Sequence, residues 1–580
     1  MRTVGRKNTL VNRKFMEFFF PSVLMSMSTS LGIIVDSIIV GNVLGSSELA
    51  AMNLIMPLSL CFTAITAIFG IGASIYIPVL KGKLDHHSAD KCLTLSCLAW
   101  IVCSMITVCL GIFATNPIAA FLAGSSGLQE YVAEYLKVYL IGSPFTFITM
   151  IFPHIIRSDG KPKLASNVLI IANVTNLMLD VVFMKFVGMG LAGGALASIC
   201  GYALGSFLYL IYVFSKGRTL HLSRIKAADF CLYWDMIKYS ISSILGQGFM
   251  FAKLWIFNML IASVAGQEGL TAFSVCTSCL SFVSMFIAGA AQTMMPMVGA
   301  FHGSGDHTAI GMTIRKALKM VVGCCLATTV IFELFPSAVL MLFGVTQGAA
   351  LEIGIVAVRL FSLALTGIGI SFLFMYYVQA SGMPAFSMQI CALEGFFVVV
   401  PVALIMAKCF GINGFWLAYT MNEIIVIAFI LLKTKYVVKK SNGNLYSVFM
   451  LQKSQKDTLE LSVPVLEKEA CALAVEEILV HTESMAHTES KDFFIKRSSI
   501  EPLMQHIFEL SRQAYEEKKE KTSGRILDVI LEADRISCKD MGKNYDSLDQ
   551  KVQFSISSDE SWSMEHTLMI GMNYLELKKG

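Results

Sequence analysis

Long apolar runs, each long enough to cross a lipid bilayer, constrain this chain more than any other feature. A spanning helix needs roughly 20 mostly apolar residues, and its backbone polar groups must be satisfied within the helix because lipid offers no partners. The sequence predicts twelve such helices, near residues 15–41, 52–80, 92–114, 131–156, 163–187, 191–214, 237–263, 270–301, 316–338, 355–380, 385–408 and 413–437.

The composition agrees with a membrane protein and excludes other classes. Hydrophobic residues make up 55% of the chain and charged residues only 15%, whereas soluble proteins carry about 25% charged residues. The formal net charge of +4 is too small to indicate a nucleic-acid partner. A basic N-terminus leads into a run of full spanning length, so we expect a first helix that stays in the bilayer, not a cleaved signal.

Lysine and arginine in the short loops predict the orientation. The N-terminus and the even-numbered loops are basic, except for the tenth loop, while the odd-numbered loops carry little beyond Lys185 and Lys408. We therefore expect both termini on the cytoplasmic side of a plasma or inner membrane. The basic positions are Arg2, Arg6, Lys7, Arg13, Lys14, Lys81, Lys83, Lys91, Arg157, Lys161, Lys163, Lys216, Arg218, Arg224, Lys226, Arg315, Lys316, Lys319, Lys433, Lys435, Lys439 and Lys440.

The two halves of the apolar part resemble each other at an offset of about 221 residues. The matches are Leu44–Ala51 with Ala265–Ala272, Ser158–Pro162 with Ala380–Pro384, and Gly190, Gly193 and Ala197 with Gly411, Gly414 and Ala418. Six helices per half is an even number, so both halves enter the membrane from the same side, as in a parallel repeat. We predict two six-helix lobes, residues 1–222 and 223–440, around a central cavity.

Several motifs occur in a fixed order along the first lobe. They are Val35-Asp36-Ser37, then Gly41, Gly45 and Glu48–Ala51, then Arg157–Pro162, Asn176–Asp180 and Gly190–Ser198. In this order the chain resembles the multidrug and toxic-compound extrusion (MATE) transporters over about residues 10–437. The resemblance implies a secondary transporter, not an enzyme, that exports small and often cationic amphipathic compounds in exchange for Na⁺ or H⁺.

Two acidic residues inside spans are candidate functional groups, because a carboxylate in a membrane helix is costly. Asp36, Asp180 and Ser198 are predicted at similar depths below the outer surface, and Asn176 is one helical turn from Asp180. These four side chains could coordinate Na⁺, or the two carboxyls could carry a proton. The family resemblance places the cation-coupling site at the same positions. The alternative is that Asp180 and Asn176 only join helices and Ser198 only packs.

The second lobe departs from this pattern, because no Asp occupies a matching position in its spans. Lys253, Glu394 and Glu423 fall near mid-membrane instead, where we interpret them as cavity-lining or gating residues. The alternative is a charge-compensated structural group. An unpaired ammonium at this depth would cost several kcal/mol, so we expect Lys253 to have a carboxylate partner, Glu394 first and Glu423 second.

After about residue 441 the composition changes, and charges become frequent. Residues 441–580 are enough for one cytosolic α+β domain. The pattern predicts strands at 458–463, 526–531, 535–538 and 571–577, helices at 464–485 and 499–521, and a loop at 540–546. The whole chain is thus expected to be an all-α polytopic membrane protein with a small α+β addition.

The order of these last elements resembles the ATP-binding domain of anti-sigma-factor kinases and histidine kinases. Asp540 and Gly542 match the adenine-binding loop of that family. Gln505 and Glu509 stand where its Mg²⁺-binding motif has Glu and Asn, and the glycine-rich lid is missing before His566. We therefore expect a degenerate domain that does not hydrolyse ATP and acts in regulation or in contact with a cytosolic protein.

Two other functions use comparable architectures. A flippase for lipid-linked saccharides would more often line its cavity with Lys and Arg, whereas Lys253 is the one clear mid-span basic residue here. A membrane-anchored sensor would use the C-terminal domain as its effector. Apart from a coupling Na⁺, no cofactor or metal is predicted; the expected partners are a small-molecule substrate, the coupling cation and the lipid bilayer.

Overall fold

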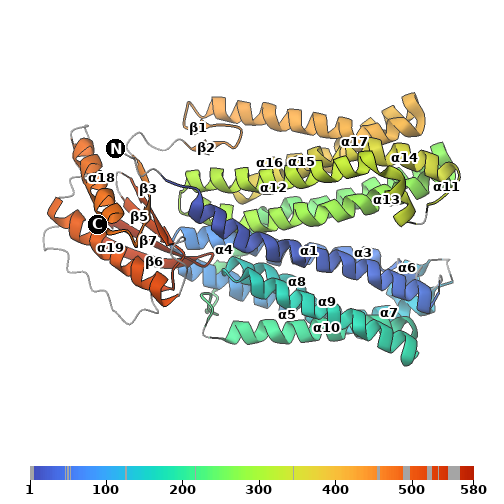
Figure 1. The fold of residues 1–580 in the computed structure, drawn as a ribbon. Helices are drawn as coiled ribbons and strands as arrows, with labels where there is room; N and C mark the ends of the chain where they lie inside the picture. The colour runs from blue at the N-terminus through green and yellow to red at the C-terminus, as the bar shows by residue number, and fades with distance from the viewer. Residues whose placement is uncertain are drawn as a thin grey trace.

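The structure is a computed structural model that describes most of the chain. The described residues are 6–45, 48, 51–52, 54–124, 127–215, 217–343, 345–452, 458–486, 497–518, 525–532, 535–545 and 562–579. A bundle of long helices carries a small sheet and two helices at one end, and both chain ends lie there (Figure 1). We call this the terminal end of the bundle, and the opposite side the far end.

The first lobe contains helices that follow the predicted spans 1 to 6. Their bounds are α1 Thr9–Val43, α3 Met56–Thr66, η1 Ala67–Gly72, α4 Ala73–Gly82, α5 His86–Phe113, α6 Thr115–Ala123, α7 Gln129–Ile141, α8 Ser143–Ser158, α9 Pro162–Asp180, η2 Val181–Phe186 and α10 Gly190–Phe214. Three of these segments form one span: α3, the π-helical turn η1 and α4 follow one another directly.

The second lobe repeats this order with longer continuous helices. Its elements are η3 Ala227–Phe230, α11 Cys231–Gly303, α12 His307–Leu334, α13 Pro336–Leu342, α14 Ala349–Ser362, α15 Leu365–Ala380, α16 Pro384–Ala392, η4 Leu393–Phe397 and α17 Val399–Lys440. Non-helical backbone at Gly266 divides α11, and at Gly411 it divides α17. Each break separates two spans. Glycine occupies both breaks because only glycine readily adopts these positive φ angles.

The described helices account for the predicted multi-span architecture. Eight continuous helical segments are long and apolar enough to cross a membrane, and two bent pairs, α7 with α8 and α14 with α15, pass the same test together. Two of the eight segments, 77 and 57 residues long, each contain a glycine break and two spans. The described chain therefore provides twelve spans.

The repeat predicted from sequence reappears in the backbone. Gly160 and Gly382 have φ angles of 85° and 78°, and Gly190 and Gly411 have 61° and 62°. Asp85 and Asp306 each cap the next helix by accepting a hydrogen bond from the backbone NH three residues on. Matched turns and caps at matched positions indicate two copies of one six-helix design.

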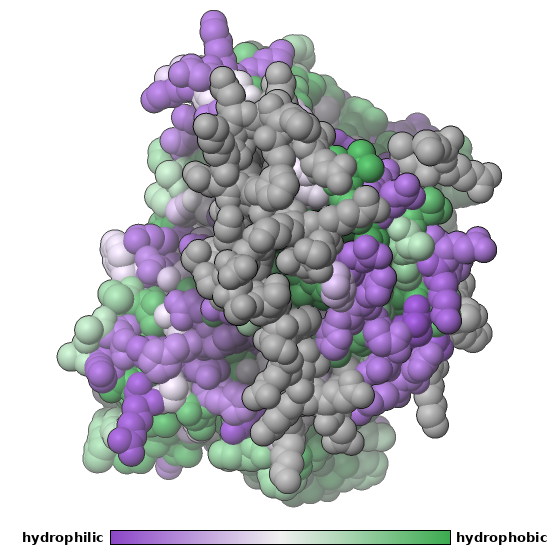
Figure 2. Space-filling view, turned by 90° about the vertical axis from the view of Figure 1, so that its left-hand side faces the viewer, coloured by the Kyte–Doolittle hydropathy of each residue, from purple (hydrophilic) through white to green (hydrophobic). Residues whose placement is uncertain are grey.

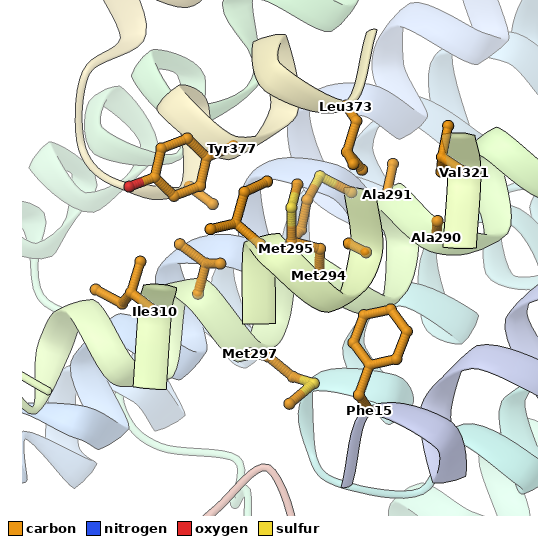
Figure 3. Packing of buried hydrophobic residues seen from close by; sticks show 14 of the residues in the cluster. Phe15, Ala290, Ala291, Met294, Met295, Met297, Ile310, Val321, Leu373 and Tyr377 are labelled. Carbon is orange, nitrogen blue, oxygen red and sulfur yellow. The ribbon is translucent and has the colours of Figure 1, made fainter. Parts of the chain in front are cut away.

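The two lobes pack tightly near the terminal end. A Cβ on Gly82 would collide with the carbonyl oxygen of Ala300, and a Cβ on Gly303 with that of Val79. Phe15 of α1 lies beside Met294 and Met297 of α11 in the same seam (Figure 3). Two backbones can approach this closely only where one residue is glycine. Because α4 of the first lobe and α11 of the second are in direct contact here, the lobes are closed against each other at this end.

The C-terminal region, residues 458–579, is a five-stranded antiparallel sheet with two helices. The strands are β3 Leu459–Pro464, β4 Ile526–Leu531, β5 Arg535–Asp540, β6 Trp562–Met569 and β7 Met572–Lys579, in the order β3-β4-β5-β7-β6, and the helices are α18 Lys468–Ala486 and α19 Arg497–Glu517. From this end the described surface is largely hydrophilic (Figure 2). The sequence analysis missed β6, and it missed the short hairpin of β1 Leu445–Tyr446 and β2 Leu451–Gln452.

The sheet has two different faces because successive side chains on a strand alternate. Apolar residues such as Val529 and Cys538 face α18 and α19 and form a core. The opposite face carries Asp528, Lys539 and Tyr574, which are cross-strand neighbours. These polar side chains are buried, because the opposite face rests on the terminal end of the bundle.

Candidate cation-coupling site

Close packing of α9 and α10 brings together three of the four predicted site residues. A Cβ on Gly201 of α10 would lie 2.5 Å from the carbonyl oxygen of Ala172 on α9, so only glycine permits this approach. On the other side of α9, Asn173 Nδ2 donates a hydrogen bond to Ser28 Oγ of α1 at 2.9 Å. The result is a three-helix contact with α9 in the middle.

Asn176 is the hub of the polar group inside this contact. Its Nδ2 donates hydrogen bonds to Asp180 Oδ2 at 3.2 Å and to Ser198 Oγ at 3.0 Å. Asp180 is buried, with 2% of its surface exposed. The carboxyl groups of Asp36 and Asp180 also lie close enough to interact with each other. The structure therefore brings all four predicted residues into one cluster in the first lobe.

The two carboxyl groups set the chemistry of this cluster. Two neighbouring carboxylates offer only acceptors and repel each other, so a proton on one of them or a cation between them stabilises the pair. Asp36 Oδ1 is also buried and has no hydrogen-bond partner among the described residues. Such an unsatisfied buried oxygen is costly unless a proton or cation binds there. The donor set of carboxylates and a hydroxyl fits Na⁺ as well as a proton.

Tyrosine residues that the sequence analysis did not select surround the pair. Tyr135 and Tyr202 both lie close enough to experience the charges of Asp36 and Asp180. Tyr139 stacks on Phe62 at a ring-centroid distance of 5.2 Å. Tyrosines are abundant in membrane helices, and no sequence spacing could have separated these from packing residues.

The second lobe holds a different polar group. Lys253 of α11 experiences the charge of Glu394 more strongly than that of Glu423. No ion pair within 4.0 Å joins Lys253 to either one in the described part of the chain. Glu423 instead accepts hydrogen bonds from Ser371 Oγ at 2.8 Å and Asn422 Nδ2 at 3.0 Å. The three charged residues lie near one another without an ion pair among the described residues, so a carboxylate partner for Lys253 stays a prediction.

A buried ion cluster at the terminal end was not anticipated from the sequence. Arg6 forms ion pairs with Asp306 at 2.7 Å, Glu460 at 3.0 Å and Asp528 at 3.5 Å. Lys539 of β5 binds Asp306 at 2.6 Å. We call these five residues the junction cluster. It joins the start of α1, the loop before α12 and the polar face of the sheet.

Electrostatics favour the charged form of Asp306 within the junction cluster, whereas burial lowers the pKa of Lys539 and raises that of Asp528. Burial alone would raise the pKa of Asp306, but Arg6 and Lys539 hold that pKa well below its usual range. Lys539 also lies over the rings of Phe301 and Tyr574, at 5.5 and 5.3 Å. A buried ion pair of this kind is strongly destabilised when one partner is removed.

The positions expected to bind a nucleotide are not arranged as an open site. Asp540 is fully buried, and Ser511 Oγ, Asn573 Nδ2 and the Gly542 backbone NH donate hydrogen bonds to its carboxylate at 2.7, 2.8 and 2.7 Å. The Tyr545 hydroxyl donates a fourth. Burial raises the pKa of Asp540, although these hydrogen bonds oppose the rise. Both carboxylate oxygens are thus occupied by protein groups.

Gln505 and Glu509, the expected Mg²⁺-motif positions, are both exposed on α19. Ser511 is the α19 residue that reaches Asp540. The structure therefore does not bring Gln505 and Glu509 together with Asp540. The predicted helix at 464–485 begins later than expected, at Lys468, and the predicted loop at 540–546 is described only as far as Tyr545.

The helix bundle with an acid-lined site in one of two repeated lobes defines a secondary transporter, and three comparisons support this class. The MatE family model matches residues 21–182 and 242–405. The multidrug export protein MepA of Staphylococcus haemolyticus is 23% identical over 408 residues, which cover 69% of this chain and 88% of that protein.

Solved structures show the same fold. A MATE structure in complex with MaL6 matches with a TM-score of 0.69 and 20% identity, over 75% of this chain and 97% of that one. An outward-facing multidrug resistance MATE transporter of the MOP superfamily matches with a TM-score of 0.68 and 20% identity, over 76% and 99%. The chain belongs to the MatE family. It is a cation-coupled antiporter, not an enzyme, and its substrates are small molecules.

Proposed function

We propose that this protein exports small, often cationic amphipathic compounds, and that Asp36 and Asp180 bind the coupling Na⁺ or H⁺. The observation that carries the proposal is the buried cluster of Asp180, Asn176 and Ser198 beside an Asp36 carboxyl oxygen that has no hydrogen-bond partner among the described residues. A cation that binds one lobe arrangement better than the other shifts the equilibrium between them. The aromatic residues around the pair suit an amphipathic cation.

We propose further that the terminal end is cytoplasmic, in a cell membrane. The support is the distribution of Lys and Arg over the loops at this end. The lobes are closed at this end, and Asp36 lies toward the far end of α1. In this orientation the closed end faces the cytoplasm, and Asp36 lies nearer the outer side of the membrane.

The coupling assignment predicts that Asp36→Asn and Asp180→Asn abolish gradient-driven export. An amide keeps the shape of the side chain but cannot take up and release a proton, and it binds Na⁺ more weakly than a carboxylate does. The measurement is efflux of a fluorescent cation from energised vesicles, with Na⁺ and pH gradients collapsed separately. Glu352→Gln, an exposed acid at the start of α14, is the matched control and should transport normally.

A folded Asp36→Asn protein that exports at the normal rate under either gradient would contradict the assignment. Collapsing one gradient at a time identifies the coupling ion. Folding is checked independently by the amount of monodisperse protein recovered from the membrane.

A second function is proposed for the C-terminal region, residues 458–579: it restrains the lobes at the terminal end and so regulates transport. The region touches both lobes. Lys539 binds Asp306 of the second lobe. On the first lobe, the turn at Gly571 packs against Gly160 and its carbonyl accepts a hydrogen bond from Lys14.

This restraint follows from alternating access. Opening the terminal end requires the lobes to separate there, and a rigid sheet bound to both must release one of them first. Arg6 and, from the C-terminal region, Lys539 depress the pKa of Asp306, so the Lys539 part of this effect stabilises docking at and above the ordinary pKa of the carboxyl group. Its contribution is lost only as pH falls through the depressed value. Mild acidification therefore does not release the region through Asp306.

We expect Lys539→Met to weaken docking and raise the rate of export several-fold, since removing one buried partner costs about 3–5 kcal/mol. Lys543→Met is the control, because Lys543 is exposed and pairs only with Glu517 among the described residues. An unchanged export rate in folded Lys539→Met protein would refute the restraint.

A further inference from the structure

One face of α12 is built unlike the rest of the bundle surface. Positions three or four residues apart lie on one side of a helix, and on this side α12 carries Arg315, Lys316 and Lys319 at its terminal end. Towards the middle of the bilayer the same side continues with Met320, Gly323 and Cys324. A cationic stretch therefore leads directly into an apolar one.

The cationic stretch lines a pocket of about 360 Å³. The other walls come from Asn8 and Asn12 at the start of α1, and from Tyr446 of the hairpin that follows the last span. Among the described residues, none of the side chains lining this pocket is acidic. The pocket is thus shared by both lobes and carries three positive charges.

The apolar stretch lines a second cavity, also of about 360 Å³. Phe19 of α1 and Phe286 of α11 form its walls together with Met320, Gly323 and Cys324. Lys319 lines both cavities, so the two are adjacent. A Cβ placed on Gly323 would meet no atom within 4 Å, which shows that the groove is open beside this residue.

Acidic side chains of the described residues do not neutralise the positive charges of the three cations. None of Arg315, Lys316 and Lys319 forms an ion pair within 4.0 Å in the described part of the chain. The carboxylate beside the pocket, Glu460, is already bound by Thr308 at 2.7 Å and by Arg6 at 3.0 Å. Three like charges on one helical turn repel one another, so the pocket favours an anion.

We infer that this composite site binds an anionic phospholipid from the leaflet at the terminal end. The phosphate would lie among the three cations, with the asparagine amides as further donors, and an acyl chain would lie along the groove at Phe19 and Phe286. A free phosphate would use only the first cavity. Since α1 and α12 belong to different lobes, a bound lipid would bridge the seam on the membrane side.

The test uses the full chain, purified in a neutral detergent. Affinity for phosphatidylglycerol is measured by intact-complex mass spectrometry, with phosphatidylcholine, a zwitterion of no net charge, as the reference. Each basic residue near an anionic lipid contributes about 1 kcal/mol, or about fivefold, so Arg315→Gln with Lys316→Gln and Lys319→Gln should weaken phosphatidylglycerol binding on the order of 100-fold. Phosphatidylcholine binding should not change.

A matched control removes the same charge at the same end of the bundle. Lys435→Gln with Lys439→Gln and Lys440→Gln lies on α17, outside both cavities, and should leave phosphatidylglycerol affinity within about twofold, because only lysines close to the bound lipid contribute. An equal loss in both triple variants would mean diffuse charge attraction and would overturn the site.

The groove is tested separately with Gly323→Phe, which keeps every cation. Filling the groove should weaken binding of phosphatidylglycerol while leaving soluble glycerol phosphate unaffected. If Gly323→Phe binds the lipid normally, or if glycerol phosphate binds as tightly as the lipid, the site holds a phosphate only and the lipid assignment fails. Recovery of monodisperse protein distinguishes either result from misfolding.

Discussion

The two lobes share one backbone design but hold opposite charge arrangements. In the first lobe, two carboxyl groups contact each other, supported by Asn176 and Ser198, with no Lys or Arg bound to either in the described chain. In the second, Lys253 stands near Glu394 and Glu423. The two carboxyl groups of the first lobe need an added cation or proton to offset their negative charge. The acids of the second lobe have a cation of the chain itself, Lys253, nearby.

This difference suggests that the two repeated lobes have different roles in transport. Matched glycine turns and helix caps keep the lobes equivalent as moving bodies. The polar residues inside the two lobes can differ, because such a side chain changes the local charge without changing the fold. We therefore expect gradient dependence to reside in the first lobe, and changes in the second to alter stability or substrate affinity.

The largest effect is expected from Lys253→Met. Lys253 is the cation that lies near Glu394 and Glu423 in the described part of the chain, and removing it leaves two acids uncompensated at mid-membrane, which should destabilise the protein by up to about 3–5 kcal/mol. Thermal unfolding in detergent measures the change. Lys238→Met, an exposed lysine earlier on α11, should have little effect.

The double variant Lys253→Met with Glu394→Gln tests the partnership itself. If the two residues interact, the second substitution should restore part of the lost stability. Additive losses in this cycle would mean that Lys253 has no energetic partner in Glu394, and the contrast between the lobes would disappear.

A smaller effect is expected from Glu394→Gln alone. The amide keeps the size of the side chain, and its partner Lys253 can still be accommodated by Glu423. We expect the KM for export of a cationic substrate to rise several-fold, with the Na⁺ or pH dependence unchanged. Loss of gradient dependence in this variant would place a second coupling site in the second lobe.

The smallest effect is expected from Ser198→Ala. Ser198 accepts one of the two hydrogen bonds from Asn176, and losing a single neutral hydrogen bond costs about 1 kcal/mol. Export should persist with at most a few-fold slower rate. Complete loss of coupling would show that the hydroxyl is a direct cation ligand and not a support for Asn176.

Much of the bundle was predictable because its signals are local. Span lengths, the repeat and the positions of Asp36 and Asp180 follow from apolar runs and spacing. The junction cluster was not predictable. In the sequence, Arg6 and Asp306 look like ordinary charged loop residues, and only the folded structure brings the sheet against them. Similarly, strand β6 pairs with β7 through an alternation too weak to identify from the sequence alone.

The junction cluster also imposes an order on the making of the protein. Arg6 and its partner Glu460 are separated by 454 positions. At roughly 5–20 residues per second, Arg6 waits on the order of half a minute to a minute and a half after its own synthesis before this partner exists. Every span has then been made. Assembly of the junction cluster is thus among the last steps of biogenesis, and it can only be completed by a chain whose spans have all been translated.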